Sequence, residues 1–224
     1  MTLAKQTMFH RLTPDLVIRS PWRPFRPRHG EQSLVLEGGS VFPPSHPTTL
    51  LCLDLLKKAL ASRPGAYVLD VGCGSGILAL AALALRSPKV VAVDISGRAV
   101  RRTRANAGRN GLAPGLLAVR GSTECLRGPF DLIMANLPWS VHLEKVEEFC
   151  RLAGPDGALI IAGCKDVQAE PLLSGYQSRG WTVMAHGSRD SWAPEPPPEL
   201  SYTWVAWLLV RQGGCPEANA STPW

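Results

Sequence analysis

Closely spaced glycines between two apolar segments limit the folds open to this chain more than any other feature. Residues 67–71 have the composition of a buried strand, glycines follow at 72, 74 and 76, and residues 76–85 are rich in Ala and Leu. Glycine allows the backbone a tight turn, and the free N–H groups at the start of a following helix can face a ligand. This order predicts a strand, a ligand-binding turn and a helix.

The rest of the chain continues this alternation of short apolar strands and helices. Strands that are apolar throughout are typical of a parallel sheet covered on both faces. Two successive strands near the end, over 181–185 and 202–211, predict a hairpin at the sheet edge. We therefore expect an α/β fold with a Rossmann-like doubly wound sheet, mostly parallel with an antiparallel closing strand. The other expected strands cover 90–94, 116–120, 130–135 and 158–163, and the helices cover 48–61, 76–85, 97–110, 143–152 and 168–179.

By composition the chain divides into three regions. Residues 1–44 are rich in Pro and Arg, which predicts an N-terminal arm with short strands at 15–20 and 33–36. Residues 45–211 contain the strand–helix alternation and form the expected main domain. Residues 212–224 contain Gly, Pro, Ser and Thr, which predicts a disordered tail.

Charge and cysteine content narrow the possible functions. The formal net charge is +6 and arginines cluster twice, which is typical of a nucleic-acid or ribosomal partner but equally of a solvated helix face. The six cysteines lack CxxC spacing, so we expect no metal site or disulfide framework, but reduced core thiols in a cytoplasmic protein. No segment has the pattern of a signal peptide or the length to span a bilayer, so we expect no membrane partner. The arginine clusters comprise Arg19, Arg23, Arg26 and Arg28, and then Arg98, Arg101, Arg102 and Arg104.

The spacing of the glycines indicates which ligand the turn binds. A dinucleotide-binding turn requires Gly-x-Gly-x-x-Gly, whereas Gly72, Gly74 and Gly76 follow Gly-x-Gly-x-Gly, with Ile77 after them. This spacing disfavours a nicotinamide oxidoreductase. The same glycines after Asp70 in the strand are the form used for S-adenosylmethionine, and we expect all four residues to contribute to its site.

Polar side chains at the ends of the next strands complete the predicted cofactor site. Asp94 follows the glycine turn by roughly 20 residues, the spacing at which an acidic side chain accepts hydrogen bonds from ribose hydroxyls. Alternatively, Asp94 caps the next helix. Ser122 and Thr123 follow the third strand, where they either contact the adenine or form a simple turn.

The tetrapeptide Asn136-Leu137-Pro138-Trp139 follows the fourth strand, at the edge where open parallel sheets bind ligands. We predict catalytic roles for three of its residues: the Asn136 amide and the Pro138 carbonyl would orient an attacking N–H, and the Trp139 ring would stack on a planar acceptor. The alternative is that Pro138 and Trp139 only end the strand and pack. His142 nearby could act as a base, although a lone histidine is more often a surface residue.

Several segments are shared with one known family of enzymes. They are Pro21-Trp22, Leu36 to Gly39, His46 to Leu53, Val68 to Ala82, Asn106 to Gly111 and Ala135-Asn136. Through them the chain resembles the class I S-adenosylmethionine-dependent methyltransferases, most closely the bacterial ribosomal protein L11 methyltransferase family. This resemblance implies that Thr49, Gly72, Asp94 and Asn136 lie at cofactor-binding positions, and that residues 45–211 are a methyltransferase domain.

The sequence departs from that family at three places. Pro43-Pro44-Ser45 replaces Gly-Thr-Gly, Pro138-Trp139 follows the asparagine, and we expect the family's N-terminal substrate-recruiting domain to be missing. Asn-Leu-Pro-Trp is similar to the Asn-Pro-Pro-Tyr motif of enzymes that methylate adenine amines or glutamine amides. We therefore expect methyl transfer to a nitrogen of a protein or RNA. The alternatives are a methyltransferase for small molecules and a non-catalytic adenosylmethionine- or nucleotide-binding module, and the acceptor and oligomeric state stay open.

Overall fold

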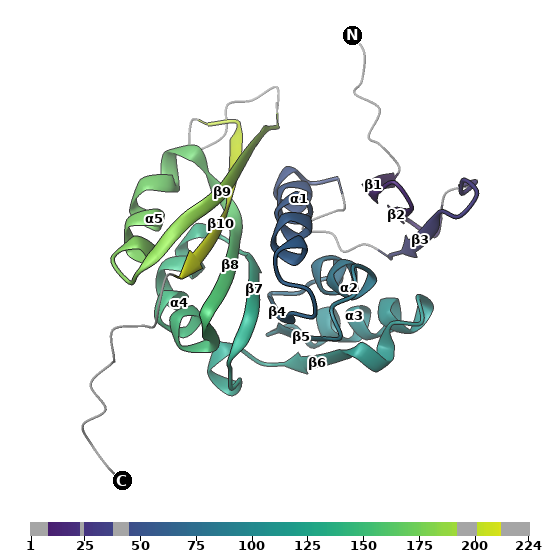
Figure 1. Cartoon of the computed structure of the whole chain (residues 1–224), viewed down its shortest axis with the longest axis horizontal. Helices are drawn as coiled ribbons and strands as arrows, with labels where there is room; N and C mark the ends of the chain where they lie inside the picture. The colour runs from purple at the N-terminus through teal and green to yellow at the C-terminus, as the bar shows by residue number, and fades with distance from the viewer. Residues whose placement is uncertain (1–8, 23–24, 38–44, 192–200, 212–224) are drawn as a thin grey trace.

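A seven-stranded sheet forms the centre of the computed structural model, which describes residues 9–22, 25–37, 45–191 and 201–211 (Figure 1). Its strands are β4 (Tyr67–Val71), β5 (Lys89–Asp94), β6 (Leu116–Arg120), β7 (Phe130–Asn136), β8 (Ala153–Lys165), β9 (Trp181–Asp190) and β10 (Thr203–Arg211). Their order across the sheet is β6-β5-β4-β7-β8-β10-β9. The first five of these run parallel, and β10 is antiparallel to both of its neighbours. The predicted Rossmann-like sheet, its antiparallel closing strand and the edge hairpin are confirmed.

Helices cover both faces of this sheet. They are α1 (Pro47–Ala61), α2 (Ile77–Ala84), α3 (Gly97–Arg109), α4 (Trp139–Leu152) and α5 (Ala169–Gln177). The first three lie on one face and the last two on the other (Figure 1). Alternate strand residues enter two separate cores: Val68 packs on the α1 side, and its neighbour Leu69 packs on the α4 side. None of the helices in the described ranges is long and apolar enough to span a bilayer.

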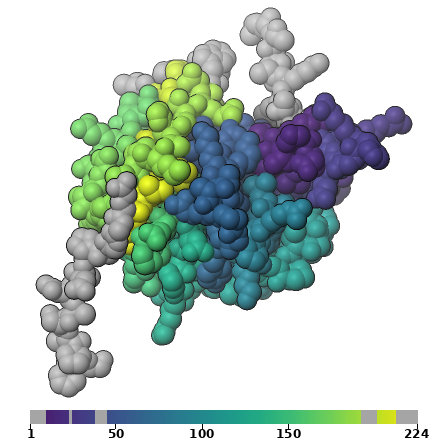
Figure 2. All heavy atoms as spheres, in the orientation of Figure 1, coloured from purple at the N-terminus to yellow at the C-terminus, as the bar shows by residue number. Residues whose placement is uncertain are grey.

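A second, three-stranded sheet packs beside α1 and α2, as the purple atoms in Figure 2 show. It consists of β1 (Phe9–Thr13), β2 (Leu16–Arg19) and β3 (Gln32–Val35), of which β1 was not predicted. Leu12, Ile18 and Leu34 are buried in the same core as α1 and α2. At the end of α3, the Asn110 amide accepts the Val35 N–H at 2.7 Å and donates to the Val35 carbonyl at 2.8 Å. The arm therefore shares its core with the main domain, and the boundary at residue 44 stays a prediction.

Helix α4 and strand β8 both begin earlier than predicted. Helix α4 starts at Trp139 instead of 143, because the Pro138 carbonyl accepts the N–H groups of Val141 and His142 at 3.0 and 3.3 Å. Strand β8 starts at Ala153 and includes the turn predicted at 154–157, through an irregular register with β7. The earlier start of α4 matters for the site, because it places Trp139 in a helix rather than in a loop.

Four of the five cysteines that the structure describes are buried, as predicted, and the fifth is not. The buried thiols are Cys52, Cys73, Cys150 and Cys164. Cys125 is exposed, because it ends a short surface turn (η2, Thr123–Cys125), where its Sγ donates to the Ser122 carbonyl at 3.0 Å. Cys215 and the predicted disordered tail lie outside the described residues.

Candidate functional site

The glycine turn joins β4 to α2 at the carboxyl end of the sheet. Gly72, Gly74 and Gly76 have φ angles of 69°, 56° and 82°, a region that other residues rarely adopt. The Val93 carbonyl of β5 accepts the Gly72 N–H at 2.8 Å. A Cβ on Gly76 would lie 2.8 Å from the Thr103 side chain of α3. The turn is therefore held between β5 and α3 in a form that only glycine permits.

Asp94, at the end of β5, faces this turn. Its Oδ2 accepts the Gly74 N–H at 3.0 Å, and its Oδ1 accepts the Ser96 N–H at 2.8 Å. The cap of α3 is the Ser96 hydroxyl, which accepts the Ala99 N–H at 3.4 Å. The alternative interpretation of Asp94 as the helix cap is therefore wrong. Its carboxylate instead lies on the wall of a cavity.

Asp70, in β4, is buried beneath the same turn. Its Oδ2 accepts the Ala79 N–H of α2 at 3.0 Å, which supports the first turn of that helix. Burial raises the pKa of Asp70 to about 7, and the nearby charge of Asp94 acts in the same direction. A buried carboxyl group beside another negative charge is stabilised either by binding a proton or by a cationic ligand.

A cavity of about 620 Å³ opens beside the turn, at the ends of β4, β5 and β7. Gly72 and Gly74 of the turn line it, as do the predicted residues Thr49, Asp70, Asp94, Ser122, Thr123, Asn136 and Pro138, whereas Gly76 is not among the residues on its wall. Three buried atoms of this wall have no hydrogen-bond partner among the described residues: Thr49 Oγ1, Thr123 Oγ1 and Asn136 Oδ1. A buried polar group without a partner costs about 1–3 kcal/mol. Three such atoms around one cavity indicate a polar ligand there.

Leu137 connects the glycine turn to β8. Its N–H donates to the Ala162 carbonyl at 3.0 Å. Gly163 has a φ of 103°, and a Cβ at that position would overlap the Leu137 carbonyl. On the other side, a Cβ on Gly72 would overlap the Leu137 side chain. Leu137 thus fits in its position only because residues 72 and 163 are glycines, and this packing fixes Asn136 on the cavity wall.

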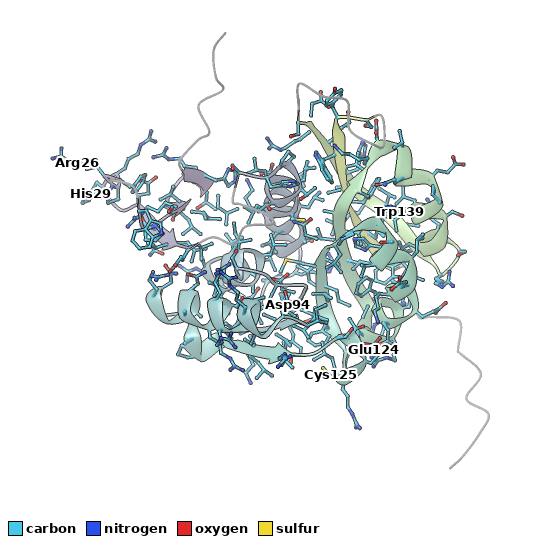
Figure 3. All side chains as sticks on the ribbon, turned by 180° about the vertical axis from the view of Figure 1, so that it is seen from behind. Arg26, His29, Asp94, Glu124, Cys125 and Trp139 are labelled. Atoms are coloured by element: carbon cyan, nitrogen blue, oxygen red, sulfur yellow. The ribbon has the colours of Figure 1, made fainter. Side chains whose placement is uncertain are left out.

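The other two predicted catalytic residues are placed differently. Among the described residues, Trp139 is not one of those that line the cavity; its side chain is 37% exposed on α4, and Figure 3 shows it well apart from Asp94. Pro138 does line the cavity, but its carbonyl already accepts two N–H groups of α4, which occupies both of its lone pairs. The proposed role of the Pro138 carbonyl is thereby corrected, and the stacking role of Trp139 stays a prediction.

His142 is neither a surface residue nor placed as a base. It is fully buried, its Nε2 donates to the Ala162 carbonyl at 2.9 Å, and its Nδ1 lies 3.3 Å from the Tyr176 hydroxyl. Burial lowers the pKa of His142 to about 4, although hydrogen bonds to the backbone of Ala162 and Leu137 oppose this shift. The neutral ring therefore supports the loop that carries Asn136.

We expect His142 to make the fold sensitive to acid. Its pKa is about 4 in the folded protein, against about 6.5 in an unfolded chain, so the unfolded state binds the proton more readily. The stabilisation is fully present above pH 6.5 and is lost as the pH falls towards 4, by roughly 3 kcal/mol. Denaturant titrations from about pH 7 to about pH 4 measure this loss. His142→Gln should lose less stability over that interval, and an identical pH dependence in both proteins would contradict the assignment.

Three basic side chains of the cavity wall were not predicted as site residues. Arg98 and Arg102 of α3 and Lys145 of α4 line the cavity, and Lys145 forms an ion pair with Glu124. The sequence showed both arginines as part of a cluster. Their spacing of one helical turn places them on one face, but only the packing of α3 decided that this face meets the cavity.

Asn106, in α3, has a structural role that the sequence did not indicate. Its Nδ2 donates to the Ser75 carbonyl in the glycine turn at 2.9 Å, and to the Glu37 carbonyl after β3 at 3.1 Å. Its Oδ1 accepts the Glu37 N–H at 3.0 Å. One buried amide therefore joins the N-terminal sheet to the ligand-binding turn.

Solved structures share this arrangement. A crystal structure of ribosomal protein L11 methylase from Lactobacillus delbrueckii subsp. bulgaricus has a TM-score of 0.75 and 25% identity, covering 91% of this chain and 98% of that one. A putative RNA methyltransferase from Pyrococcus horikoshii, 17% identical, has a TM-score of 0.61 over 79% of this chain and 92% of its own, and shows the fold alone. The fold and the glycine-turn cavity define a Rossmann-like domain of the methyltransferase class.

The chain belongs to the ribosomal protein L11 methyltransferase (PrmA) family, whose model matches residues 5–194. The ribosomal protein L11 methyltransferase of Parasynechococcus marenigrum (strain WH8102) is 40% identical over 185 residues, which are 79% of this chain and 63% of the relative. That of Pelotomaculum thermopropionicum is 36% identical over 179 residues, 79% of this chain and 58% of the relative. The chain thus spans about three-fifths of the length of these relatives.

Proposed function

We propose that this chain transfers a methyl group from S-adenosylmethionine to a nitrogen atom of a ribosomal protein or of RNA. The observation that carries the proposal is the set of three unpartnered polar atoms, on Thr49, Thr123 and Asn136, around one cavity. The glycine turn and Asp94 lie on the same wall. The cavity volume of about 620 Å³ suits a ligand of nucleoside size.

Each part of the wall has a role in holding this cofactor. Asp94 would accept hydrogen bonds from the ribose hydroxyls, while Ser122 and Thr123 would contact the adenine. The raised pKa of Asp70 favours a cation nearby, which suits a positively charged ligand. S-adenosylmethionine, when bound, supplies an electrophilic methyl group on a sulfonium. The protein supplies position and orientation to an in-line displacement.

Asn136 is the residue of this chain best suited to orient the acceptor. Its unpartnered Oδ1 can accept a hydrogen bond from an attacking N–H. An amine acceptor must lose its proton first, and the apolar wall formed by Leu137 and Val141 would lower its pKa. The names of the relatives favour a ribosomal-protein acceptor. A cytoplasmic location would suit the reduced thiols expected from the sequence. Stacking by Trp139 would apply only to a planar acceptor held outside the cavity wall.

Two measurements test the proposal. Calorimetric titration should detect S-adenosylhomocysteine binding to the purified chain and no binding of NAD. Incubation with methyl-labelled S-adenosylmethionine should then transfer label to a ribosomal-protein or RNA fraction. Binding without transfer to either fraction or to small molecules would favour the non-catalytic module, and binding of NAD alone would overturn the proposal.

We expect Thr49→Val to weaken S-adenosylhomocysteine binding roughly three- to tenfold without lowering stability. The Thr49 Oγ1 has no hydrogen-bond partner among the residues that the structure describes, so its removal breaks none of the hydrogen bonds found there and affects only the contact with the ligand. Calorimetry gives the affinity, and denaturant titration gives the free energy of unfolding.

Thr48→Val is the matched control for this variant. Thr48 is as buried as Thr49, but its hydroxyl lies 2.8 Å from His46 Nδ1 and does not line the cavity. The control should lose about 1 kcal/mol of stability and keep its affinity for S-adenosylhomocysteine. If both variants changed affinity equally, Thr49 would have no specific role at the ligand.

A further inference from the structure

Helix α3 has an unbalanced charge. It contains five arginines and no acidic residue, and β6 adds Arg120 beside it. Arg104 donates to the Ala118 carbonyl at 2.5 Å, and Arg109 forms an ion pair with Glu37. Among the described residues, no carboxylate forms an ion pair with the remaining four guanidinium groups. These four, Arg98, Arg101, Arg102 and Arg120, are called the arginine patch below.

Two members of the arginine patch gather at one point, the start of α3. A Cβ built on Gly97 would lie 3.5 Å from Arg101 Nη1 and 3.5 Å from Arg120 Nε. Like charges held this close repel each other, and an anion between them relieves the repulsion. A guanidinium group presents a planar fork of N–H donors that matches phosphate oxygens. The geometry of these two side chains therefore suits a phosphate group.

The arginine patch also lies beside the cavity. Arg98 and Arg102 form part of the cavity wall, whereas Arg101 and Arg120 lie outside it. An anion on the outer pair would therefore be bound next to the mouth of the proposed methylation site.

The N-terminal sheet adds a feature that distinguishes nucleic acid from an acidic protein. The loop between β2 and β3 carries Trp22, which is 78% exposed, and its Arg26 and His29 project away from the molecule, in the same half as α3 (Figure 3). Proteins that bind single strands combine cationic side chains with exposed aromatic rings on which bases stack. An acidic peptide offers no base to such a ring, so a ligand that reaches both this loop and the arginine patch is better matched by a nucleic acid.

We propose that the arginine patch binds the phosphate backbone of single-stranded RNA beside the mouth of the cavity. The choice of RNA over DNA rests on the proposed function, because the acceptor is then a ribosomal component. The phosphate contacts themselves follow from the arginine patch alone and require no methyl transfer.

The test compares two double variants that remove the same charge. Arg101→Gln/Arg120→Gln changes the patch without altering the cavity wall. Lys58→Gln/Arg63→Gln removes two cations at the end of α1, one in its last turn and one just after it, at the opposite end of β4. Fluorescence anisotropy with a labelled RNA of mixed sequence, over a series of salt concentrations, gives the dissociation constant for each. We expect the patch variant to bind at least tenfold more weakly. The logarithm of its binding constant should also fall less steeply with the logarithm of the salt concentration. The slope should be smaller by about 1.4, since each of the two lost phosphate contacts to a single strand contributes about 0.7.

Defined outcomes would overturn this inference. The two variants would bind RNA equally only if the arginines of the patch did not contact phosphate, so equal RNA affinities refute the proposal. Poly-glutamate that binds the unaltered chain as tightly as RNA does would indicate an acidic protein partner instead. DNA of the same sequence that binds more than threefold tighter than the RNA would refute the choice of RNA. Titration of S-adenosylhomocysteine on the same samples keeps this result separate from the proposed function, which fails only if that ligand does not bind or no methyl group is transferred.

Discussion

Gly163→Ala is expected to lower methyl transfer by roughly a hundredfold, because a displacement of about 1 Å at a reacting group has an effect of that size. Gly163 has a φ of 103°, and a Cβ there would overlap the backbone of Leu137. Leu137 would have to move, and Asn136 on the cavity wall would move with it. The strained backbone should also cost up to about 3 kcal/mol of stability. Turnover with labelled cofactor and denaturant titration measure the two effects.

Gly175→Ala is the control for this strain. Gly175 lies in α5, has no positive φ, and a Cβ there would meet no atom within 4 Å. Alanine should therefore stabilise the helix by up to about 1 kcal/mol and leave turnover unchanged. Full turnover in Gly163→Ala would show that the position of Leu137 does not determine the activity.

Asp94→Ala is expected to weaken S-adenosylhomocysteine binding by about ten- to a hundredfold. The variant would lack the carboxylate that is proposed to form charge-assisted hydrogen bonds with the ribose. It would also lack the hydrogen bond from the Gly74 N–H to that carboxylate. Asp94→Asn keeps the shape but not the charge, so its affinity should lie between those of the other two proteins. Calorimetry measures all three.

Asp131→Ala provides the matched control for Asp94. Asp131 Oδ2 accepts the Tyr67 N–H at 2.8 Å, a carboxylate–backbone hydrogen bond as at Asp94, but between β7 and β4 and at the opposite end of β4. Its loss should reduce stability by about 1–3 kcal/mol and leave the affinity unchanged. Equal loss of affinity in both alanine variants would mean that general loosening of the sheet, not ribose recognition, weakens binding.

The parts of the fold that were predicted correctly have strong local signals. The strands at 67–71 and 116–120 were found with the observed bounds, because each is a short apolar segment next to glycine or proline. Strand β1 was missed, because its sequence FHRLT has no regular alternation of apolar and polar residues and its register with β2 is irregular between Arg11 and Thr13. The start of α4 was misplaced, because a proline with an extended backbone can still accept the first helical hydrogen bonds.

Some residues of the candidate site were also predicted correctly from local signals, and others were not. Gly72, Gly74, Asp94 and Thr49 were placed on the cavity by spacing and by resemblance, and they do line it, whereas Gly76 does not. His142 was misjudged, because its sequence neighbours do not reveal that Ala162 and Tyr176 enclose it.

Local order along the chain was sufficient to specify which segments form strands and where the ligand-binding turn lies, because strand periodicity and glycine's backbone freedom act over a few residues. Which side chains meet around the cavity depended on contacts between distant segments. Arg98 and Arg102 reach its wall because α3 packs against β5 and β6, and among the described residues no carboxylate forms an ion pair with any member of the arginine patch. Trp139 is kept from the wall because it is the first residue of α4, a helix that turns Val141 and Lys145 towards the cavity. Such placements follow from close packing of the whole domain, which no segment specifies alone.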